Sequence, residues 1–407
     1  MLVAKRSNSL ASVLDDSLCS GCGACTYISP SVQMTTRSNG LRRPELQMTM
    51  TDEEQVLFDS VCPGRLVARS ASAKHYDPLW GPFESISRGY SNDAEIRHSG
   101  SSGGVISECL VYLLEEHLVD AVIQTSASDK SPWSNQTVVS TSREEVIKAA
   151  GSRYAPSSPL DTLPNLDLEK RYAFVGKPCD VSALRALANK DEKIQEAFPY
   201  LISFFCAGVP NTNGAKEILK KMGQNETDVV QFRYRGNGWP GTTKATSSSG
   251  STTEMSYDDA WGGILTKHVQ FRCKVCPDGS ASSADLVAAD GWETNDRGYP
   301  VFDDLPGQSI VIARTEAGTE LQHKLTESKI ISLSDCLPDE VAAMQPGQVS
   351  KAASVYARTL GLRLLGKSYP NFLSFEPHKV ASKIPLRANI RNLIGLLRRA
   401  LVGRLGD

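Results

Sequence analysis

Apolar residues recur along the chain with two different periods. A helical spacing, which places side chains on one face of a helix, covers Ile106, Leu110, Leu113, Leu114 and Leu118. Short, largely apolar runs, typical of strands buried on both faces of a sheet, occupy 119–124, 172–175, 201–205 and 286–289. A second helical segment, 181–188, follows one of them. Strands interspersed with helices predict an α/β (α+β) fold built on a mixed sheet.

The end of the chain has a helical period of its own and is basic. Ile390, Leu393, Ile394, Leu397 and Leu401 align beside Arg391, Arg398, Arg399 and Arg404. Between Lys379 and Asp407 there are seven Lys or Arg residues and one Asp. Such a helix fits an anionic membrane surface or an acidic partner such as a ferredoxin. It also fits packing on its own domain with a solvated basic face, the interpretation that we favour.

A cysteine run near the N-terminus is the first pattern with a chemical meaning. Residues 18–25 read Leu-Cys-Ser-Gly-Cys-Gly-Ala-Cys, which spaces Cys19, Cys22 and Cys25 as C-x2-C-x2-C. Three thiolates at this spacing can face one centre, and such soft ligands select iron–sulfur clusters, zinc or copper(I). The bacterial ferredoxin run continues as x3-C-P, but here Ser29 stands in that place, followed by Pro30.

The fourth ligand is predicted from a second copy of the same frame. Cys62 precedes Pro63, while the first three cysteine places of that copy hold Asp52, Gln55 and Phe58. In two-cluster ferredoxins the fourth cysteine of one run completes the cluster of the other. The two losses therefore match and leave one site, which favours a 4Fe–4S cluster over zinc or disulfides: Cys19, Cys22, Cys25 and Cys62.

Four more cysteines follow in the α/β part of the chain. Cys179 and Cys206 each come just past a predicted strand, and Cys273 and Cys276 form a C-x2-C pair in a predicted loop. Because ligands bind at the carboxyl ends of strands in open α/β sheets, these four thiols are the economical choice for a second 4Fe–4S site. The alternative leaves the two strand-end cysteines as buried small hydrophobes, with zinc on the pair. Cys109 and Cys336 are expected to be ordinary thiols.

Two small-residue loops are candidates for holding an organic cofactor. Residues 97–104 read Arg-His-Ser-Gly-Ser-Ser-Gly-Gly directly before the predicted helix, and free N–H groups at a helix N-terminus suit a phosphate. A flexible linker before a capped helix is equally compatible with this pattern. Residues 236–241 read Gly-Asn-Gly-Trp-Pro-Gly after Arg233 and Arg235. Trp239 can stack on a flat ring there, or the stretch is a glycine-rich hairpin with an anchoring tryptophan.

Length, charge and composition bound the remaining possibilities. The 407 residues allow two or three domains, and a formal net charge of −2 argues against a nucleic-acid footprint. Neither a signal-peptide core nor an apolar window long enough for a membrane span occurs. We therefore expect reduced or metal-bound cysteines and a cytoplasmic protein. The proline and glycine residues within 77–82 suggest a linker. The expected units are a cysteine module (1–76), a cofactor domain (77–335) and a helical basic region (336–407).

The motifs in combination resemble those of a known family. In fixed order stand the Ser-Gly-Ser-Ser-Gly-Gly loop, Gly-Ser-Arg-Tyr at 151–154, Phe-Val-Gly-Lys-Pro-Cys-Asp at 174–180, and the 236–241 stretch. The Cys273/Cys276 pair and Asp290-Gly291-Trp292 complete the set. This set is similar to the family of coenzyme F420 (8-hydroxy-5-deazaflavin) hydrogenase and dehydrogenase beta subunits. That family includes stand-alone reductases such as 7-hydroxymethyl chlorophyll a reductase.

The resemblance implies a ferredoxin-like 4Fe–4S module, then a mixed-sheet domain with FAD and a second 4Fe–4S cluster, and a helical tail. Its implied cluster ligands are the cysteines at 179, 206, 273 and 276. Lys177 is implied to stabilise negative charge on reduced flavin, and Asp290 to bind a ribityl hydroxyl or relay a proton. The residues expected at the FAD site are Ser99, Gly100, Ser101, Ser102, Gly103, Gly104, Ser152, Arg153, Tyr154, Lys177, Arg235, Gly238 and Trp239.

The working hypothesis is an oxidoreductase that converts single electrons into pairs. A ferredoxin-like donor supplies electrons, two clusters pass them on, and FAD delivers a hydride to an organic or deazaflavin acceptor. One rival is a non-catalytic relay subunit of a hydrogenase or dehydrogenase complex. The other is a structural zinc protein that binds partners through its basic tail.

Overall fold

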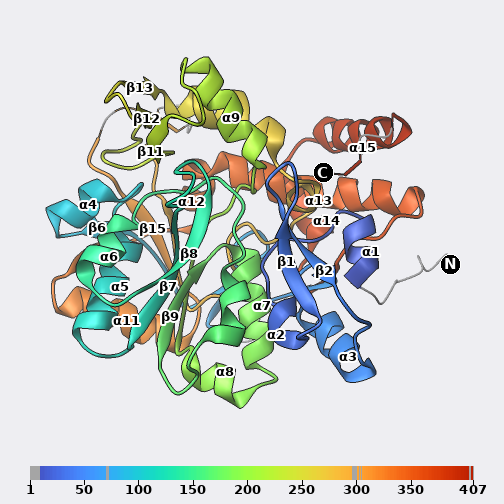
Figure 1. The fold of residues 1–407 in the computed structure, drawn as a ribbon, viewed down its shortest axis with the longest axis horizontal. Helices are drawn as coiled ribbons and strands as arrows, with labels where there is room; N and C mark the ends of the chain where they lie inside the picture. Colours follow the sequence, from blue (N-terminus) through green and yellow to red (C-terminus); the bar gives the residue numbers. More distant parts are fainter. Residues whose placement is uncertain are drawn as a thin grey trace.

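The computed structural model describes residues 10–69, 73–295, 300, 301, 303, 305–402, 405 and 406. Its largest element is an eight-stranded sheet (Figure 1) in the order β16–β6–β15–β14–β10–β9–β7–β8. The inner strands β14, β10, β9 and β7 are parallel, and the outer ones pair antiparallel with their neighbours. In chain order the strands are β6 (Ser85–Ser91), β7 (Ala121–Ala127), β8 (Asn135–Ser140), β9 (Tyr172–Gly176), β10 (Tyr200–Phe204), β14 (Leu286–Asp290), β15 (Ser309–Ala313) and β16 (Ile331–Asp335).

The four apolar runs form the parallel strands because both of their faces are covered. In β9, Tyr172 and Phe174 belong to one hydrophobic cluster, whereas Ala173 and Val175 belong to another. This alternation follows from the two-residue period of a strand. The strands predicted at 119–124, 172–175, 201–205 and 286–289 are thus confirmed, with ends that differ by at most three residues.

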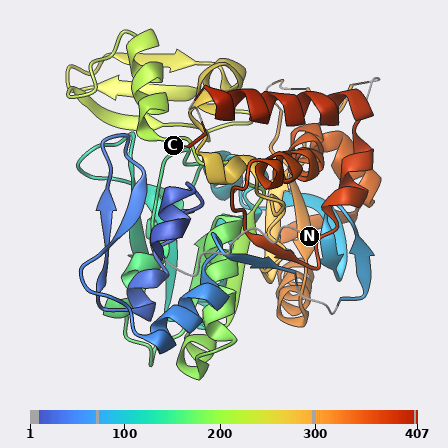
Figure 2. The same cartoon turned by 90° about the vertical axis from the view of Figure 1, so that its right-hand side faces the viewer.

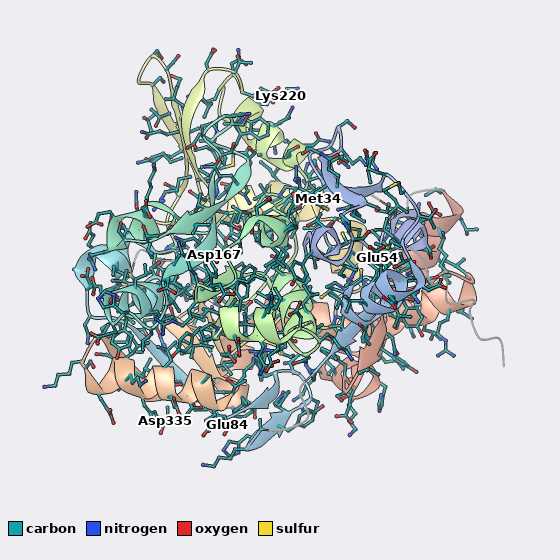
Figure 3. The ribbon with its side chains drawn as sticks, turned by 60° about the horizontal axis from the view of Figure 1, so that its bottom comes forward. Met34, Glu54, Glu84, Asp167, Lys220 and Asp335 are labelled. Carbon is teal, nitrogen blue, oxygen red and sulfur yellow. The ribbon has the colours of Figure 1, made fainter. Side chains whose placement is uncertain are left out.

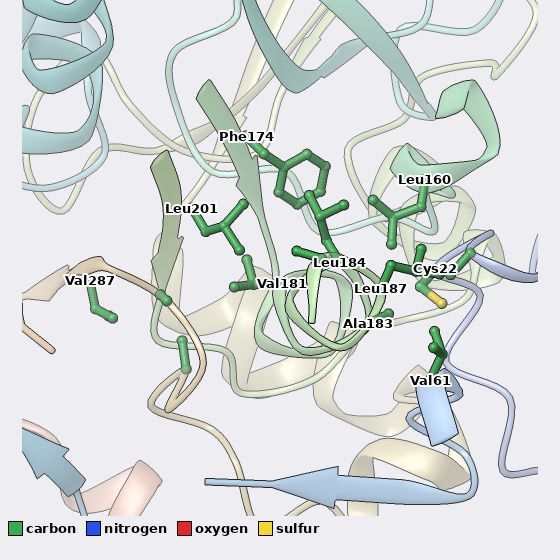
Figure 4. Packing of buried hydrophobic residues seen from close by; sticks show 14 of the residues in the cluster. Cys22, Val61, Leu160, Phe174, Val181, Ala183, Leu184, Leu187, Leu201 and Val287 are labelled. Carbon is green, nitrogen blue, oxygen red and sulfur yellow. The ribbon is translucent and has the colours of Figure 1, made fainter. Parts of the chain in front are cut away.

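Helices lie on both faces of the sheet. One face carries α4 (Ala94–Ser99), α5 (Val105–Glu115), α6 (Arg143–Lys148) and α11 (Glu316–Glu327), which share a cluster that includes Leu110 and Leu321. The other face carries α7 (Pro178–Ala188) and α8 (Glu192–Ala197). Figure 4 shows Leu184 of α7 beside Phe174 of the sheet. The helices predicted at 106–118 and 181–188 are confirmed, although α5 ends at Glu115 and Leu118 lies beyond it.

The N-terminal cysteine segment packs against α7. It comprises α1 (Leu10–Asp15), α2 (Cys25–Ile28), the antiparallel pair β1 (Val32–Thr36) and β2 (Arg42–Leu46), and α3 (Asp52–Val61). A capping box opens α3: the Thr51 side chain accepts from the Glu54 N–H, and Glu54 (Figure 3) accepts from the Thr51 N–H. Cys22 and Val61 share a hydrophobic cluster with Leu187, so this segment has its core in common with the sheet. The predicted domain boundaries stay predictions.

The linker predicted at 77–82 is instead a tight hairpin. β4 (His75–Asp77) pairs antiparallel with β5 (Gly81–Phe83). Asp77 Oδ1 accepts from the N–H groups of Leu79 and Trp80, at 2.7 and 2.9 Å. An aspartate that bonds the backbone just ahead of it favours a turn, so the proline and glycine residues mark a turn rather than an open connection. Nearby, β3 (Leu66–Ala68) pairs in parallel with β17 (Asn371–Leu373).

A smaller, three-stranded sheet lies at the top of Figure 1 beside α9 (Thr212–Lys221). It is formed by β11 (Val229–Arg233), β12 (Thr243–Ser247) and β13 (Thr252–Met255), all antiparallel. Residues 236–241 connect β11 to β12, which confirms the glycine-rich hairpin. The chain then continues through η2 (Asp258–Ile264) and η3 (Leu265–His268).

The C-terminal region is helical, as expected. It contains α12 (Pro338–Met344), α13 (Pro346–Leu364), α14 (Pro377–Val380), η4 (Ala381–Lys383) and α15 (Leu386–Leu401). The basic helix α15, red in Figure 2, packs on α13: Leu396 is buried and Asn392 Nδ2 donates to Ser354 Oγ at 3.1 Å. Its opposite face exposes Ile390 and Ile394. Arg404 and Asp407 lie outside the described residues. None of the helices described is long and apolar enough to cross a membrane.

Candidate functional site

Four thiols line one small cavity, which we call the N-terminal sulfur site: Cys19, Cys22, Cys25 and Cys62. Cys19 and Cys22 lie in the loop that enters α2, Cys25 is the first residue of α2, and Cys62 follows α3. In that loop Gly21 and Gly23 have φ angles of +77° and +93°, a region that side chains disfavour. The small residues of the cysteine run therefore let the loop curl around the cavity. Much of the remaining lining is apolar and includes Phe58 and Val61.

The thiols of this site oppose one another's ionisation. Burial raises the pKa of the Cys22 thiol to about 11, and the nearby Asp180 carboxylate adds to the rise. Burial and neighbouring thiols also hold the pKa of Cys25 and of Cys62 far above the ordinary range. Four thiolates therefore need a compensating cation at their centre, which metal binding supplies.

The second set of cysteines also comes together, in what we call the strand-end sulfur site: Cys179, Cys206, Cys273 and Cys276. Cys179 is in the first turn of α7, directly after β9, and Cys206 follows β10. The loop expected for the C-x2-C pair is wrong for Cys273, because this residue lies in the short helix α10 (Phe271–Lys274). Burial raises the pKa of Cys206 to about 11; the charge of Lys351 opposes this rise, and the charges of Cys273 and Cys276 add to it.

Hydrogen bonds to sulfur connect this second site with the N-terminal segment. Cys273 Sγ accepts from the Val209 N–H at 3.4 Å and from Gln270 Nε2 at 3.5 Å. Gln270 is itself buried, and its Oε1 accepts from Arg43 Nη2 of β2 at 2.9 Å. Donors to thiolate sulfur stabilise its charged form. Hydrogen bonds from Val209 and Gln270 thus orient the Cys273 thiol, and Arg43 of the N-terminal segment holds Gln270 in place.

The donor sets restrict what each site can bind. Both consist of four cysteines, the ligand set of 4Fe–4S clusters and of structural zinc. In the part of the chain that the structure describes, no three or more His, Cys, Asp or Glu side chains are grouped so that they could hold a metal ion. A cubane does not require that the sulfurs meet at one point, since each thiolate binds a different iron. The residues present fit two clusters in type and number.

A cavity of about 290 Å³ adjoins the strand-end sulfur site, and we call it the strand-end cavity. It is lined by residues at the carboxyl ends of three parallel strands, such as Gly176 of β9, Phe205 after β10 and Asp290 of β14. Open α/β sheets bind ligands at this edge, and the volume is near the lower end for ligand pockets. Cys206 lines the cavity as well, so one thiol belongs to both sites.

Most of the residues predicted to bind FAD line this cavity. They are Gly100, Ser101, Ser102, Gly104, Ser152, Arg153, Tyr154 and Lys177. Five others are not among the lining residues: Ser99, Gly103, Arg235, Gly238 and Trp239. The structure therefore gathers residues of three separate motifs around the strand-end cavity. The other predicted residues do not line it.

The Ser/Gly loop is held in place, which excludes the flexible linker. Ser101 Oγ lies 2.6 Å from Ser152 Oγ, and Ser102 Oγ donates to the Gln308 carbonyl at 2.7 Å. The Gly103 N–H donates to Ser309 Oγ at 2.9 Å. Gly104, with φ +78°, then caps α5 without a side chain. The N-terminus of α5 consequently opens onto the cavity, where its dipole favours an anion.

The two predicted arginines of the site bind protein groups. Arg153 donates to the carbonyls of Phe232, Pro132 and Ser134, at 3.1, 2.7 and 2.7 Å. Arg235 is fully buried and forms a bidentate ion pair with Asp290, at 2.7 and 3.0 Å. Since Asp290 lines the cavity, its carboxylate is presented there with its charge already balanced.

Three stacked aromatic rings lie beside the Arg235–Asp290 ion pair. Trp239 stacks on Trp292 with ring centroids 4.7 Å apart, and Tyr257 stacks on the same ring at 5.8 Å. Trp292 and Tyr257 line the cavity, whereas Trp239 is 2% exposed and is not a lining residue. Trp239, which was expected at the cofactor, therefore lies behind Trp292, and Trp292 is the tryptophan that lines the cavity.

Lys177 lies where all three sites meet. Its Nζ donates to both carboxylate oxygens of Asp180, at 2.6 and 2.8 Å, and both residues line the cavity. Burial alone would lower the pKa of Lys177, but the charges of Asp180, Cys179 and Cys22 raise it above the ordinary value. Lys177 therefore carries a positive charge between the two sulfur sites and beside the cavity.

Several residues of the site were not predicted from the sequence. Asp180 follows Lys177 by one helical turn, and that spacing is a signal that could have identified the pair. Arg272, which is buried, and Lys351, which is partly buried, lie beside the strand-end sulfur site and had no comparable signal. Neither did Trp261, which lines the cavity from η2.

Two family models match consecutive parts of the chain. Residues 86–164 match the N-terminal part of the coenzyme F420 hydrogenase/dehydrogenase beta subunit, and residues 169–338 match its C-terminal part. Together the matches span more than half of the chain. The N-terminal sulfur site and α15 lie outside them.

Curated relatives carry related names. One subunit of the F420H2 dehydrogenase of Methanosarcina mazei is 23% identical over 79% of this chain and 91% of its own length. Coenzyme F420 hydrogenase subunit beta of Methanococcus voltae is 25% identical over 70% of this chain and 98% of its own. Coenzyme F420-dependent sulfite reductase of Methanocaldococcus jannaschii is 26% identical over 80% of this chain. The chain spans about half of that reductase, 49% of its length.

A solved structure shares the fold. One chain of the F420-reducing NiFe hydrogenase complex from Methanosarcina barkeri superposes with a TM-score of 0.55 at 21% identity. The match covers 71% of this chain and 97% of that one. At this level of identity the similarity establishes the α/β architecture alone.

Proposed function

The chain belongs to the family of coenzyme F420 hydrogenase/dehydrogenase beta subunits, and from this premise we propose that it is an electron-transferring oxidoreductase. In this proposal a ferredoxin-like N-terminal module holds one 4Fe–4S cluster at the N-terminal sulfur site. The mixed-sheet part holds a second cluster at the strand-end sulfur site and FAD in the strand-end cavity. Electrons enter singly and leave as a hydride to an organic or deazaflavin acceptor.

The observation that carries the proposal is the contact between a four-thiol site and the cavity. Cys206 belongs to the strand-end sulfur site and lines the cavity, so a cluster there would lie directly against a bound ligand. Lys177 lies close enough to Cys22 of the N-terminal sulfur site for the two charges to interact. A route for electrons needs such closely spaced sites, and their arrangement supports a relay that ends at the cavity.

Named residues of the cavity suit the parts of FAD. The Ser/Gly loop and the N-terminus of α5 suit its pyrophosphate, while the rings of Trp292 and Tyr257, which line the cavity, suit contact with an aromatic ring. Bound FAD would supply the conversion between single electrons and hydride. The protein groups would position it and exclude water and oxygen.

Lys177 and Asp290 keep the roles expected for them, in a form that the contacts refine. The Lys177 ammonium, held by Asp180, would offset negative charge in the cavity. Asp290 would orient a ribityl hydroxyl through an oxygen that also accepts from Arg235. Because Arg235 already compensates the carboxylate, we favour orientation over proton relay for Asp290.

Anaerobic purification followed by iron, sulfide and flavin analysis tests the proposal. Two clusters correspond to about eight irons per chain, and we expect one flavin. Cys22→Ser and Cys179→Ser should each remove about half of the iron. Cys109→Ser is the matched control, since this thiol is also buried but lies in α5 away from both sites. Zinc in place of iron, with no flavin, would support the structural zinc protein instead.

A relay role within a complex remains the second candidate function. Its support is that two of the similar proteins are named as subunits and that the similar structure is a hydrogenase complex. Anaerobic turnover with a reduced ferredoxin and acceptors such as coenzyme F420 distinguishes the two. A reductase reduces an acceptor by itself, whereas a relay subunit with full iron and flavin reduces none.

The partners form a further part of the proposal. We expect a ferredoxin-like donor near the N-terminal sulfur site and a small-molecule acceptor at the strand-end cavity. The exposed side of α15 adds peripheral contact with an anionic membrane or an acidic partner. Sedimentation with anionic and neutral vesicles separates these, because only membrane contact gives co-sedimentation that depends on anionic lipid.

A further inference from the structure

Arg272 is a buried arginine that connects the two sulfur sites. It is 2% exposed and directly precedes Cys273 in α10. Its Nη2 donates at 2.8 Å to the carbonyl of Pro63, the residue after Cys62. One side chain therefore reaches from the strand-end sulfur site to the backbone of the N-terminal sulfur site.

The groups that act most strongly on Arg272 are sulfurs. After the effect of burial, the charges of Cys276, Cys179 and Cys273 raise its pKa. Arg272 in turn helps to lower the pKa of Cys62, although burial dominates there and raises it. The guanidinium thus faces members of both four-thiol sets.

Part of its hydrogen-bonding capacity is unused. Among the described residues, Nε and Nη1 of Arg272 form no hydrogen bond of good geometry, although the Cys276 thiol lies within reach of the guanidinium. Buried donors without partners are rare and unfavourable. Arg314 differs in degree: it is about as buried, but both of its terminal nitrogens donate to carbonyls, those of Trp80, Pro82 and Ser280, and its Nε alone has no partner among the described residues. Arg272 holds its donors towards sulfur instead.

We propose that Arg272 is a positioning residue shared by both sites, whose charge and free N–H groups stabilise the more negative, reduced form of the two clusters. The inference rests on the proposed function. Two anionic clusters buried near each other repel, and a fixed cation between them offsets this repulsion. N–H groups directed at cluster sulfurs raise the reduction potential.

The redox step itself is simple. Each cluster takes up one electron from the donor, no proton is bound and no covalent bond changes. The added negative charge is then balanced by a guanidinium that is already in place. Removing Arg272 should therefore make both clusters harder to reduce.

A potentiometric titration with dithionite, followed by electron paramagnetic resonance, tests the inference. In Arg272→Gln the reduced-to-oxidised ratio of each cluster, at a fixed potential, should fall about tenfold, which is 59 mV for one electron. Arg272→Lys, which keeps the charge but loses the planar donors, should recover part of this loss. Arg314→Gln removes an equally buried arginine away from the sulfurs and should leave both potentials unchanged.

Iron content separates the possible failures. A wild-type protein without two clusters overturns both the proposed function and this inference. A variant with full iron and unshifted potentials overturns the inference alone. If Arg272→Gln does not fold, wild-type protein with 15N-labelled arginine provides a second test, by electron–nuclear double resonance of the reduced clusters. We expect a nitrogen coupling that Arg272→Lys abolishes, and its absence from the wild type overturns the inference.

Discussion

Gly104→Ala provides the sharpest test of the loop before α5. Gly104 lines the strand-end cavity with φ +78°, and a side chain in this conformation costs about 1–2 kcal/mol. An added Cβ would lie 2.9 Å from Arg97 Cα and 3.0 Å from the Ile96 carbonyl oxygen. Both contacts are backbone atoms of α4, so the loop must shift, at a further cost of about 1–3 kcal/mol.

The shift should appear as weaker flavin binding. If about 1.4–2.8 kcal/mol of this strain is relieved by moving the loop away from the ligand, the flavin Kd rises about ten- to a hundredfold. Fluorescence titration of flavin-depleted protein measures this constant directly. Circular dichroism verifies that the variant is folded.

Gly250→Ala is the matched control. Gly250 also has a positive φ, +84°, but a Cβ there would have no neighbour within 4 Å, and the residue does not line the cavity. It carries the same conformational cost without the clash, so its flavin affinity should equal that of the wild type. Equal affinities in the two variants would refute the assignment of this loop to the flavin.

Three further changes test separate parts of the account. Cys62→Ser should lower the iron content from about eight to about four atoms per chain and leave the flavin bound. Colorimetric iron and flavin assays measure both. An unchanged iron content would exclude Cys62 as a cluster ligand. Asp290→Asn leaves the Arg235 guanidinium buried without its counter-charge and should lower the free energy of unfolding by about 3–5 kcal/mol. The control Glu293→Gln, in a more exposed ion pair, should lower it by less than about 1 kcal/mol. Similar losses for the two variants in denaturant titrations would contradict this contrast. Burial raises the pKa of Glu108 above its ordinary 4.5, so its contribution to stability is full below that pH and is lost as the pH rises through the folded-state pKa. Glu108→Gln should therefore raise the midpoint of thermal unfolding more at pH 8 than at pH 4.5, and an equal gain at both would exclude a titrating carboxyl.

The parts of the fold that depend on local pattern could be predicted from the sequence. The apolar runs identified β7, β9, β10 and β14, because strands covered on both faces leave continuous hydrophobic segments. Cysteine spacing predicted the first four-thiol set, whereas the second set was predicted from two cysteines that follow strands, a C-x2-C pair and the family resemblance; the structure gathers both sets from separate segments. The Asp77–Pro82 stretch shows what composition cannot predict. Proline and glycine indicate a turn, but they do not show whether the residues on either side pair as strands.

Contacts between distant segments left no local signal. The parallel pairing of β3 with β17 joins residues about 300 positions apart; no period in either stretch announces it. Arg272 sits beside Cys273 in sequence, yet its contact with Pro63 depends on how α10 packs against the N-terminal segment. Trp239 was expected at the cofactor and lies behind Trp292, because only the fold decides which of two aromatic rings faces a cavity.

The most direct test of the two-cluster claim is an anomalous-difference map at the iron absorption edge from crystals grown without oxygen. Two compact groups of iron per chain are expected, one within Cys19, Cys22, Cys25 and Cys62 and one within Cys179, Cys206, Cys273 and Cys276. A single group, or peaks that appear only at the zinc edge, would contradict it.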